Sequence, residues 1–278
     1  MKKKLGIFLL SMLFVFAPAT TADASNGVEI NDNKNGTVTV TYSGSDMGKI
    51  AVTVKKDGAN NQYNYFIDDS SVAVDIPLTS GNGIYKVSVL KHIQDSKYSP
   101  LSSEEVQLEL EDSNAAFLTS NEMLQWNAKN AAIKKANKLV KKQKNQNGKA
   151  KALYKYLVKN YHYDYDKYAD NSSGKLAYYT PDINDTYKTK KGICYDMSAL
   201  TASMMRSVGI KTKMVTGYPK SEYFNGSQYH AWNKYYVNGK WTIIDITCDM
   251  CLYEQGMAYS KLKMKKKASQ YSNVRYEW

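Results

Sequence analysis

Three residues that can carry nucleophilic catalysis follow one another in the second half of the chain: Cys194, His230 and Asp245. A cysteine, then a histidine, then an aspartate is the order of a thiol nucleophile, its base and the group that orients the base. A thiolate in such a set attacks the carbonyl carbon of an amide and forms an acyl-enzyme. The sequence therefore predicts acyl-transfer chemistry at amide bonds, with Cys194, His230 and Asp245 as the catalytic residues.

The position of Cys194 suits a reactive thiol. It begins a segment whose apolar residues recur with the period of an amphipathic helix, and Gly209 follows where a helix would end. Gly192, just before the cysteine, is expected to form a tight turn. The unpaired N–H groups at a helix N-terminus favour an anionic thiolate. A buried structural cysteine at a helix start would leave the same pattern, so this position alone does not separate the two interpretations.

A hairpin is expected to bring the histidine and the aspartate together. Residues 238–239 are Asn-Gly, a strong signal for a two-residue turn between antiparallel strands. In that register Trp232 lies opposite Asp245, and His230 lies opposite Thr247. His230 and Asp245 then become diagonal neighbours on one face of the hairpin, with Cα atoms roughly 7–8 Å apart. The turn and the register thus predict an imidazole held by a carboxylate.

The motifs around these residues resemble the transglutaminase-like superfamily, whose core is related to papain-like proteases. The resemblance covers about residues 120–250 and depends on "GICYDMSALTASMMRSVGI" at 192–210, "VTGY" at 215–218, "HAWN" at 230–233 and "NGKWTIIDIT" at 238–247. The family's cysteine, histidine and aspartate map onto Cys194, His230 and Asp245. This implies an α+β core and an exported bacterial-type cysteine protease, amidase or protein-glutamine transglutaminase that needs no cofactor.

The same resemblance implies an oxyanion site made by the cysteine's own N–H and a second donor from an upstream segment. Here the matching segment is "KNYHYDYD" at 159–166, in which the hydroxyl of Tyr163 or Tyr165 could serve. The sequence does not choose between the two tyrosines.

Cys248 and Cys251 follow the aspartate directly and allow three interpretations. A short-loop disulfide would leave Cys194 free, which is the interpretation we favour. In the second interpretation, the pair binds zinc together with His230 and Cys194. In the third, the pair is the redox-active C-x-x-C motif of a thioredoxin-like site. The rival to an enzyme is a non-enzymatic cell-surface or wall-interaction module on the same fold. Such modules often lack one residue of the triad, whereas all three are present here.

The remainder of the chain predicts a leader and an additional domain. A basic start, a short apolar run and a small-residue cleavage site make residues 1–24 a signal peptide, so the protein is expected to be secreted, extracellular or wall-associated. Short runs rich in Val, Ile, Thr and Tyr, separated by turn signals, predict an antiparallel β-sandwich of immunoglobulin or fibronectin type over residues 25–112. Residues 113–278 are expected to form the transglutaminase-like domain, beginning with two helices between residues 121 and 160 and a loop-like region over 161–187.

The charge of the chain is strongly basic. The net charge of +12 becomes +10 when the leader, with three lysines and one aspartate, is removed. Such a surface is attracted to anionic wall polymers. The basic residues are nearly all lysines, and Arg206 and Arg275 are the arginines available for bidentate contacts, so we expect no nucleic-acid partner and a protein or peptide substrate.

Overall fold

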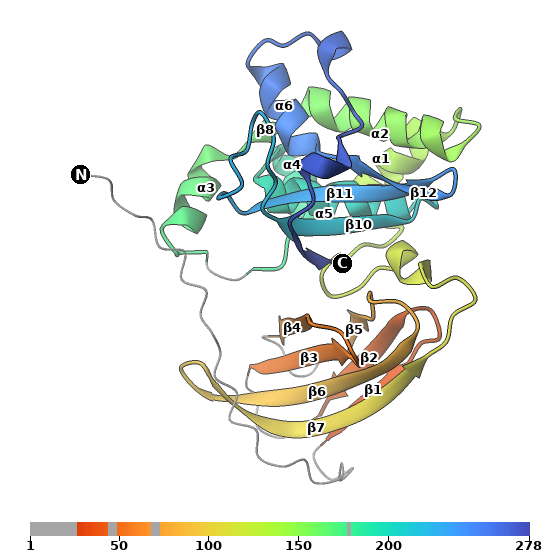
Figure 1. Ribbon diagram of the computed structural model, residues 1–278, viewed down its shortest axis with the longest axis vertical. Helices are drawn as coiled ribbons and strands as arrows, with labels where there is room; N and C mark the ends of the chain where they lie inside the picture. Colours follow the sequence, from red (N-terminus) through yellow and green to blue (C-terminus); the bar gives the residue numbers. More distant parts are fainter. Residues whose placement is uncertain (1–26, 44–48, 68–72, 177–178) are drawn as a thin grey trace. The chain divides into compact units, whose positions relative to one another are not determined.

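The fold is a mixed α+β architecture, as the sequence predicts. The computed structural model describes residues 27–43, 49–67, 73–176 and 179–278 (Figure 1). The predicted signal peptide lies outside these residues. The chain divides into two compact units, one built mainly from the N-terminal strands and the other mainly from Leu108–Trp278. The domain boundary near residue 112 and the leader stay predictions.

Seven strands form the N-terminal sandwich. They are β1 (Val28–Asp32), β2 (Thr37–Tyr42), β3 (Ile50–Lys56), β4 (Gln62–Ile67), β5 (Val74–Pro77), β6 (Gly83–Gln94) and β7 (Lys97–Leu108). One sheet has the order β1-β2-β5 and the other β4-β3-β6-β7, with β3 antiparallel to both neighbours. The predicted antiparallel sheets are confirmed. Pro100 interrupts the pattern of β7, and it is tolerated there because β7 is an edge strand.

The C-terminal unit contains a group of α-helices and a four-stranded antiparallel sheet. Its helices are α1 (Ala131–Val140), α2 (Gln146–Asn160), α3 (Tyr165–Ser172), α4 (Ile183–Thr189), α5 (Cys194–Arg206) and α6 (Ile246–Glu254). The sheet has the order β12-β11-β10-β13, formed by β10 (Thr212–Gly217), β11 (His230–Val237), β12 (Lys240–Ile244) and β13 (Val274–Glu277). Two short strands, β8 (His162–Tyr163) and β9 (Lys191–Gly192), form a separate parallel pair.

Helix boundaries differ from the sequence expectation in two places. The first helix begins only at Ala131, because the side chains of Asn127 and Asn130 accept backbone N–H groups from the preceding turns. The region 161–187 is not a loop: it contains β8, α3 and α4. The carboxylates of Asp164 and Asp182 accept N–H groups from the first turns of α3 and α4, and this capping signal was missed.

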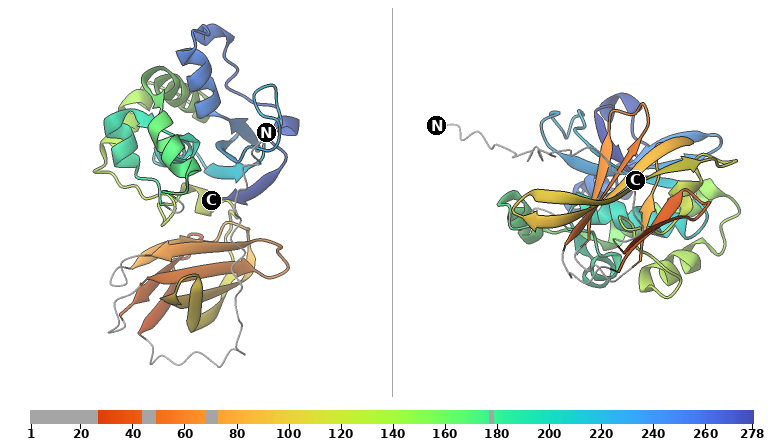
Figure 2. Two further views of the ribbon diagram at one scale, coloured as in Figure 1. Left: turned by 90° about the vertical axis from the view of Figure 1, so that its left-hand side faces the viewer. Right: turned by 90° about the horizontal axis from the view of Figure 1, so that it is seen from below.

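Helix α5 is the centre of the unit. It was expected to be amphipathic, yet every residue from Asp196 to Arg206 is buried. The reason is that α5 packs on β10 and β11 on one side and on α1, α2, α4 and α6 on the others. Figure 2 (left) shows the helices gathered on one side of the sheet. The buried guanidinium of Arg206 is satisfied by the backbone oxygens of Thr119, Thr212 and Trp278.

The predicted hairpin is confirmed. Asn238 and Gly239 have φ angles of 51° and 76°, as a type I′ turn requires. The strands pair in the predicted register from Val237 opposite Lys240 to Asn233 opposite Ile244. The pairing ends there, since α6 begins at Ile246. Thr247 is therefore in a helix and does not lie opposite His230.

Candidate active site

Cys194 is the first residue of α5 and is half-buried. The turn before it differs from the prediction. The left-handed residue is Lys190, with φ of 60°, whereas Gly192 lies in β9. A Cβ at Gly192 would meet the Cβ of Asp196 at 2.9 Å, so glycine is required there for close approach and not for a turn.

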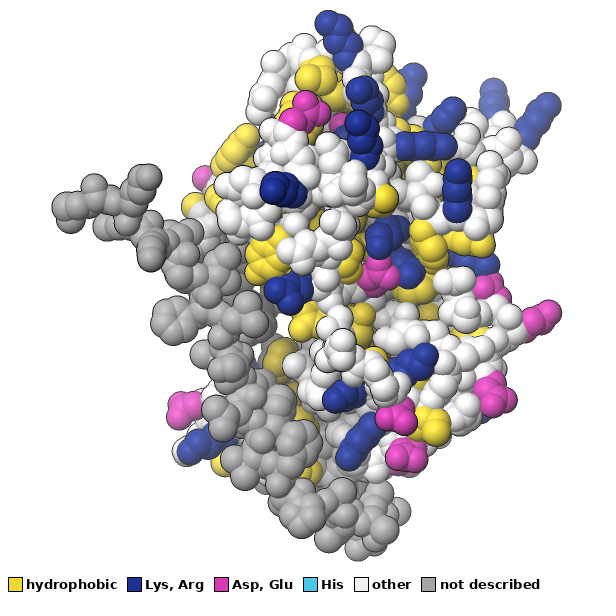
Figure 3. All heavy atoms as spheres, in the orientation of Figure 1, with side chains coloured by type: hydrophobic (Ala, Val, Ile, Leu, Met, Phe, Trp, Pro, Cys, Tyr) yellow, Lys and Arg dark blue, Asp and Glu magenta, His cyan; other side chains and the backbone are white. Residues whose placement is uncertain are grey.

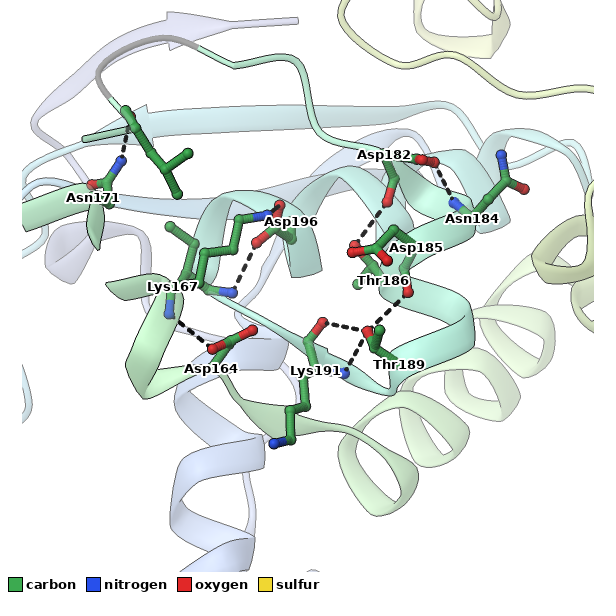
Figure 4. A network of polar contacts seen from close by, with 12 residues as sticks. Asp164, Lys167, Asn171, Asp182, Asn184, Asp185, Thr186, Thr189, Lys191 and Asp196 are labelled. Carbon is green, nitrogen blue, oxygen red and sulfur yellow. Dashed lines mark hydrogen bonds and ion pairs between the residues drawn. The ribbon is translucent and has the colours of Figure 1, made fainter. Parts of the chain in front are cut away.

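Asp196 fixes the start of the helix that carries the cysteine. Its Oδ2 accepts the backbone N–H of Ile193 at 3.0 Å, and its Oδ1 accepts Lys167 Nζ at 2.7 Å. Figure 4 shows Lys167 reaching from α3 toward Asp196 at the beginning of α5. The carboxylate thus receives one backbone donor and one cation, and it ties α3 to the start of α5 directly beside Cys194.

His230 and Asp245 meet as the sequence predicts, by a slightly different route. His230 Nε2 and Asp245 Oδ2 are 2.8 Å apart, and both side chains are buried. Asp245 directly follows strand β12 and is the N-cap of α6. Its Oδ1 accepts the N–H of Cys248 at 2.9 Å. One carboxylate therefore ends the strand, caps the helix and holds the imidazole.

The two groups stabilise each other's charges. Burial, which by itself lowers the pKa of His230, is outweighed by the charge and hydrogen bond of Asp245 and by the interaction with Cys194, so the pKa of His230 is raised. Burial by itself raises the pKa of Asp245, but His230, the N–H of Cys248 and Lys266 together lower it. Each group therefore favours the charged form of the other.

Cys194 lies beside His230 and several tyrosines. The interaction with Cys194 contributes to the raised pKa of His230, and Nε2 of the ring is already engaged with Asp245. Tyr163 lies opposite Gly192 in the β8–β9 pair, close before Cys194. Burial, and then Cys194 and Cys251, raise the pKa of the Tyr163 hydroxyl, so it stays a protonated donor. The other tyrosine left open by the sequence, Tyr165, is 65% exposed.

The favoured interpretation of the other two cysteines is wrong. Cys248 and Cys251 both lie in α6 and are not joined in a disulfide. All three cysteines are free. Burial raises the pKa of Cys251 to about 12, and it also raises that of Cys248. Within the described residues, no three His, Cys, Asp or Glu side chains converge as metal ligands.

Two contacts to Asp245 and its neighbourhood were not foreseen. The hydroxyl of Tyr271 donates to Asp245 Oδ2 at 2.9 Å, and Lys266 Nζ donates to Asp249 Oδ1 at 2.6 Å. Both residues belong to the C-terminal segment beyond α6, in which no periodic pattern or motif indicates structure. No local signal could have placed them, since their partners lie far from them in the chain.

The comparisons with known proteins concern the family that the C-terminal unit resembles. Residues 133–246 match the sequence model of the Transglutaminase-like superfamily, and this range includes Cys194, His230 and Asp245. The resemblance drawn from the motifs is therefore confirmed over this part of the chain.

Two curated relatives are the kyphoscoliosis peptidases of Mus musculus and Homo sapiens, each 32% identical over 93 residues. The match covers 31% of this chain and 14% of those proteins, so the chain spans about one seventh of their length. A solved structure of a candidate cysteine protease from Cytophaga hutchinsonii is 16% identical, with a TM-score of 0.41 and 72% of each chain covered. A transglutaminase structure is 23% identical, with a TM-score of 0.34, and covers 51% of this chain and 34% of that one. Likenesses at these values carry no argument about activity.

The surface adds two observations. Figure 3 shows lysine and arginine side chains scattered among uncharged ones on the viewed face, not merged into one basic patch. Arg206, one of two arginines considered for polyanion contacts, is buried. Among the described residues, none of the helices has the length and the apolar character needed to cross a bilayer.

Proposed function

We propose that this protein is a secreted thiol enzyme that hydrolyses amide bonds of proteins or peptides through an acyl-enzyme on Cys194. The observation that carries the proposal is the buried contact between His230 Nε2 and Asp245 Oδ2 at 2.8 Å, next to a cysteine at the start of α5. Asp245 fixes the ring so that its other nitrogen is available to the thiol, the arrangement that an activated nucleophile requires.

The proposed reaction proceeds in two halves. The Cys194 thiolate forms a bond to the substrate carbonyl carbon, and the carbonyl π electrons move to the oxygen. When the tetrahedral intermediate collapses, the C–N bond breaks and the His230 imidazolium gives its proton to the leaving amine. His230 then removes a proton from water as the water attacks the thioester. The carboxylic acid leaves, and the thiolate and imidazolium are restored.

Two donors are suited to the oxyanion of the tetrahedral intermediate. The N–H of Cys194 is at the first position of α5, where backbone donors have no intrahelical partner. Tyr163 is the better of the two upstream tyrosines, because it is opposite Gly192 and its raised pKa keeps its proton. Preorganised donors of this kind are suited to charge that develops in the transition state.

The finer assignments have different support. Hydrolysis is favoured over amine transfer because the curated relatives are named peptidases. Export depends on the predicted signal peptide at residues 1–24. Attraction to an anionic wall polymer depends on the net charge alone. A non-enzymatic surface module on the same fold is the alternative, and it predicts that the thiol has no function.

The test is an activity assay with a matched pair of cysteine variants. Purified wild type, Cys194→Ala and Cys251→Ala are incubated with glutamine-containing peptides, with and without a small primary amine, and the products are identified by mass spectrometry. We expect peptide cleavage by wild type and Cys251→Ala and none by Cys194→Ala. Ammonia release with amine incorporation would replace hydrolysis by transglutamination. Full activity in Cys194→Ala would remove the nucleophile assignment.

A further inference from the structure

The segment that follows α6 reaches back to the candidate active site. It contains two short 3-10 helices, η3 (Tyr259–Lys261) and η4 (Ala268–Gln270), and ends in β13 at the edge of the sheet. None of it falls within the residues that match the superfamily, which end at 246. Yet Tyr271, just after η4, is only 2% exposed and contacts Asp245 of the site and Trp232 beside it.

The first contact is polar. The Tyr271 hydroxyl donates to Asp245 Oδ2 at 2.9 Å, and the same oxygen is 2.8 Å from His230 Nε2. With the N–H of Cys248 on Oδ1, the buried carboxylate has three donors. Burial, and then the charge of Asp245, raise the pKa of Tyr271, so its hydroxyl stays protonated and can only be the donor in this contact.

The second contact is aromatic. The ring of Tyr271 packs edge-on against Trp232, with centroids 5.2 Å apart, and Trp232 lies nearly parallel to His230 at 6.3 Å. Tyr271, Trp232, Val215 and Ile243 form one buried cluster. Asn233 of β11 faces α5, since its amide donates to Ser198 O, so Trp232 and the cluster lie on the opposite face of the sheet. Tyr271 therefore contacts the carboxylate that holds the imidazole and also packs on the indole next to it on the same face of the sheet.

We propose that Tyr271 is a positioning residue that sets the orientation and proton affinity of the His230–Asp245 pair. This inference depends on the proposed function. The Tyr271 hydroxyl and the imidazole both donate to Asp245 Oδ2, and the hydroxyl partly neutralises the negative charge of that oxygen. Removal of the hydroxyl therefore leaves more negative charge on Oδ2 to stabilise the imidazolium. The other titratable groups that interact with Asp245 are Cys248, Asp249, Cys251 and Lys266.

The test uses Tyr271→Phe, which keeps the ring and removes the hydroxyl. The matched control is Tyr235→Phe: Tyr235 is also fully buried, lies on β11, and its hydroxyl has no hydrogen-bond partner among the described residues. The rates of Cys194 alkylation by iodoacetate and by iodoacetamide are measured against pH. Iodoacetate is an anion and is attracted by an imidazolium beside the thiolate, whereas iodoacetamide is neutral. The ratio of the iodoacetate rate to the iodoacetamide rate therefore falls as the pH rises. The pH at the midpoint of this fall reports loss of the His230 proton.

We expect this midpoint to rise by about one pH unit in Tyr271→Phe and to stay at the wild-type value in Tyr235→Phe. An unchanged or lowered midpoint in Tyr271→Phe would overturn the proposal, even if the variant had a lower thermal midpoint, because a merely structural tyrosine changes stability alone. If wild-type Cys194 showed no preference for iodoacetate at any pH, the proposed function itself would fail. This result differs from equal midpoints in wild type and Tyr271→Phe, which would overturn only the role of Tyr271.

Discussion

Replacing Asp245 by asparagine separates the two tasks of this side chain. Asparagine is as good an N-cap as aspartate, so its oxygen can still accept the N–H of Cys248, which is now 2.9 Å from Oδ1. The amide nitrogen then takes the place of Oδ2 and faces the Nε2–H of His230. Two donors cannot pair. The imidazole must change tautomer and present a proton to Cys194, or leave its position.

The cost follows from the bonds that are lost. Oδ2 accepts from His230 and from Tyr271, and a hydrogen bond to a charged group contributes roughly 1.5–3 kcal/mol to stability. The Tyr271 hydroxyl can rotate and accept from the new amide, so about one such bond is lost. We therefore expect a loss of about 2 kcal/mol, or a thermal midpoint lower by roughly 4–8 °C in a chain of this size. Loss of the carboxylate also removes the charge that holds the imidazolium.

The assay combines thermal unfolding with alkylation of Cys194 by iodoacetamide at pH 6. We expect Asp245→Asn to react about 100-fold more slowly than wild type, which is a barrier increase of about 2.7 kcal/mol. The control is Asp249→Asn, which removes a buried carboxylate that binds Lys266 and Tyr154 and not His230. It should lose stability and keep Cys194 reactive. Wild-type reactivity in Asp245→Asn would refute the reasoning, because the carboxylate would then have no influence on the thiol.

Three further predictions follow from the same structure. In native protein at pH 6 without reductant, iodoacetamide should label Cys194 alone. In denatured protein it should label Cys248 and Cys251 as well. If these two cysteines stayed unlabelled after denaturation, they would be joined in a disulfide. Burial lowers the pKa of His230, but Asp245 and Cys194 raise it to about 10, so its stabilising contribution is complete below the ordinary value of 6.5 and is lost as the pH rises through about 10. Urea unfolding should therefore show wild type losing stability relative to His230→Gln between pH 7 and 10, and parallel curves would contradict the raised pKa. Gly192→Ala should cost about 1–3 kcal/mol in urea unfolding, because its Cβ would meet Asp196 at 2.9 Å, and an unchanged stability would mean that β9 can move away freely.

The parts of the fold that the sequence predicted are those encoded by short-range patterns. The Asn-Gly turn determines a two-residue hairpin, and the hairpin determines which residues of β11 and β12 face each other. That is why the approach of His230 and Asp245 could be predicted, although they come from different elements. The predicted register is correct as far as Ile244, and there a second local signal, an aspartate that can cap a helix, takes over.

The errors have an equally specific cause. Region 161–187 contains polar residues and tyrosines without an apolar period, so periodicity alone could not indicate α3 and α4. Those helices are short, and their first turns are held by the side chains of Asp164 and Asp182. The helix pattern of α5 was predicted, but not its burial on all sides, since that depends on which elements surround it. Contacts such as Lys167 with Asp196, or Tyr271 with Asp245, join distant parts of the chain and leave no mark in a single sequence.

The identity of residue 245 nevertheless follows from the structure. The position needs a side chain that caps α6, for which aspartate, asparagine, serine and threonine are suited. It also needs a negative charge to hold the imidazolium of His230, which only aspartate and glutamate supply. Glutamate is a poor cap, and the three neutral caps have no charge. Aspartate alone meets both requirements, so a single residue couples the end of a strand and the start of a helix to the protonation of the histidine.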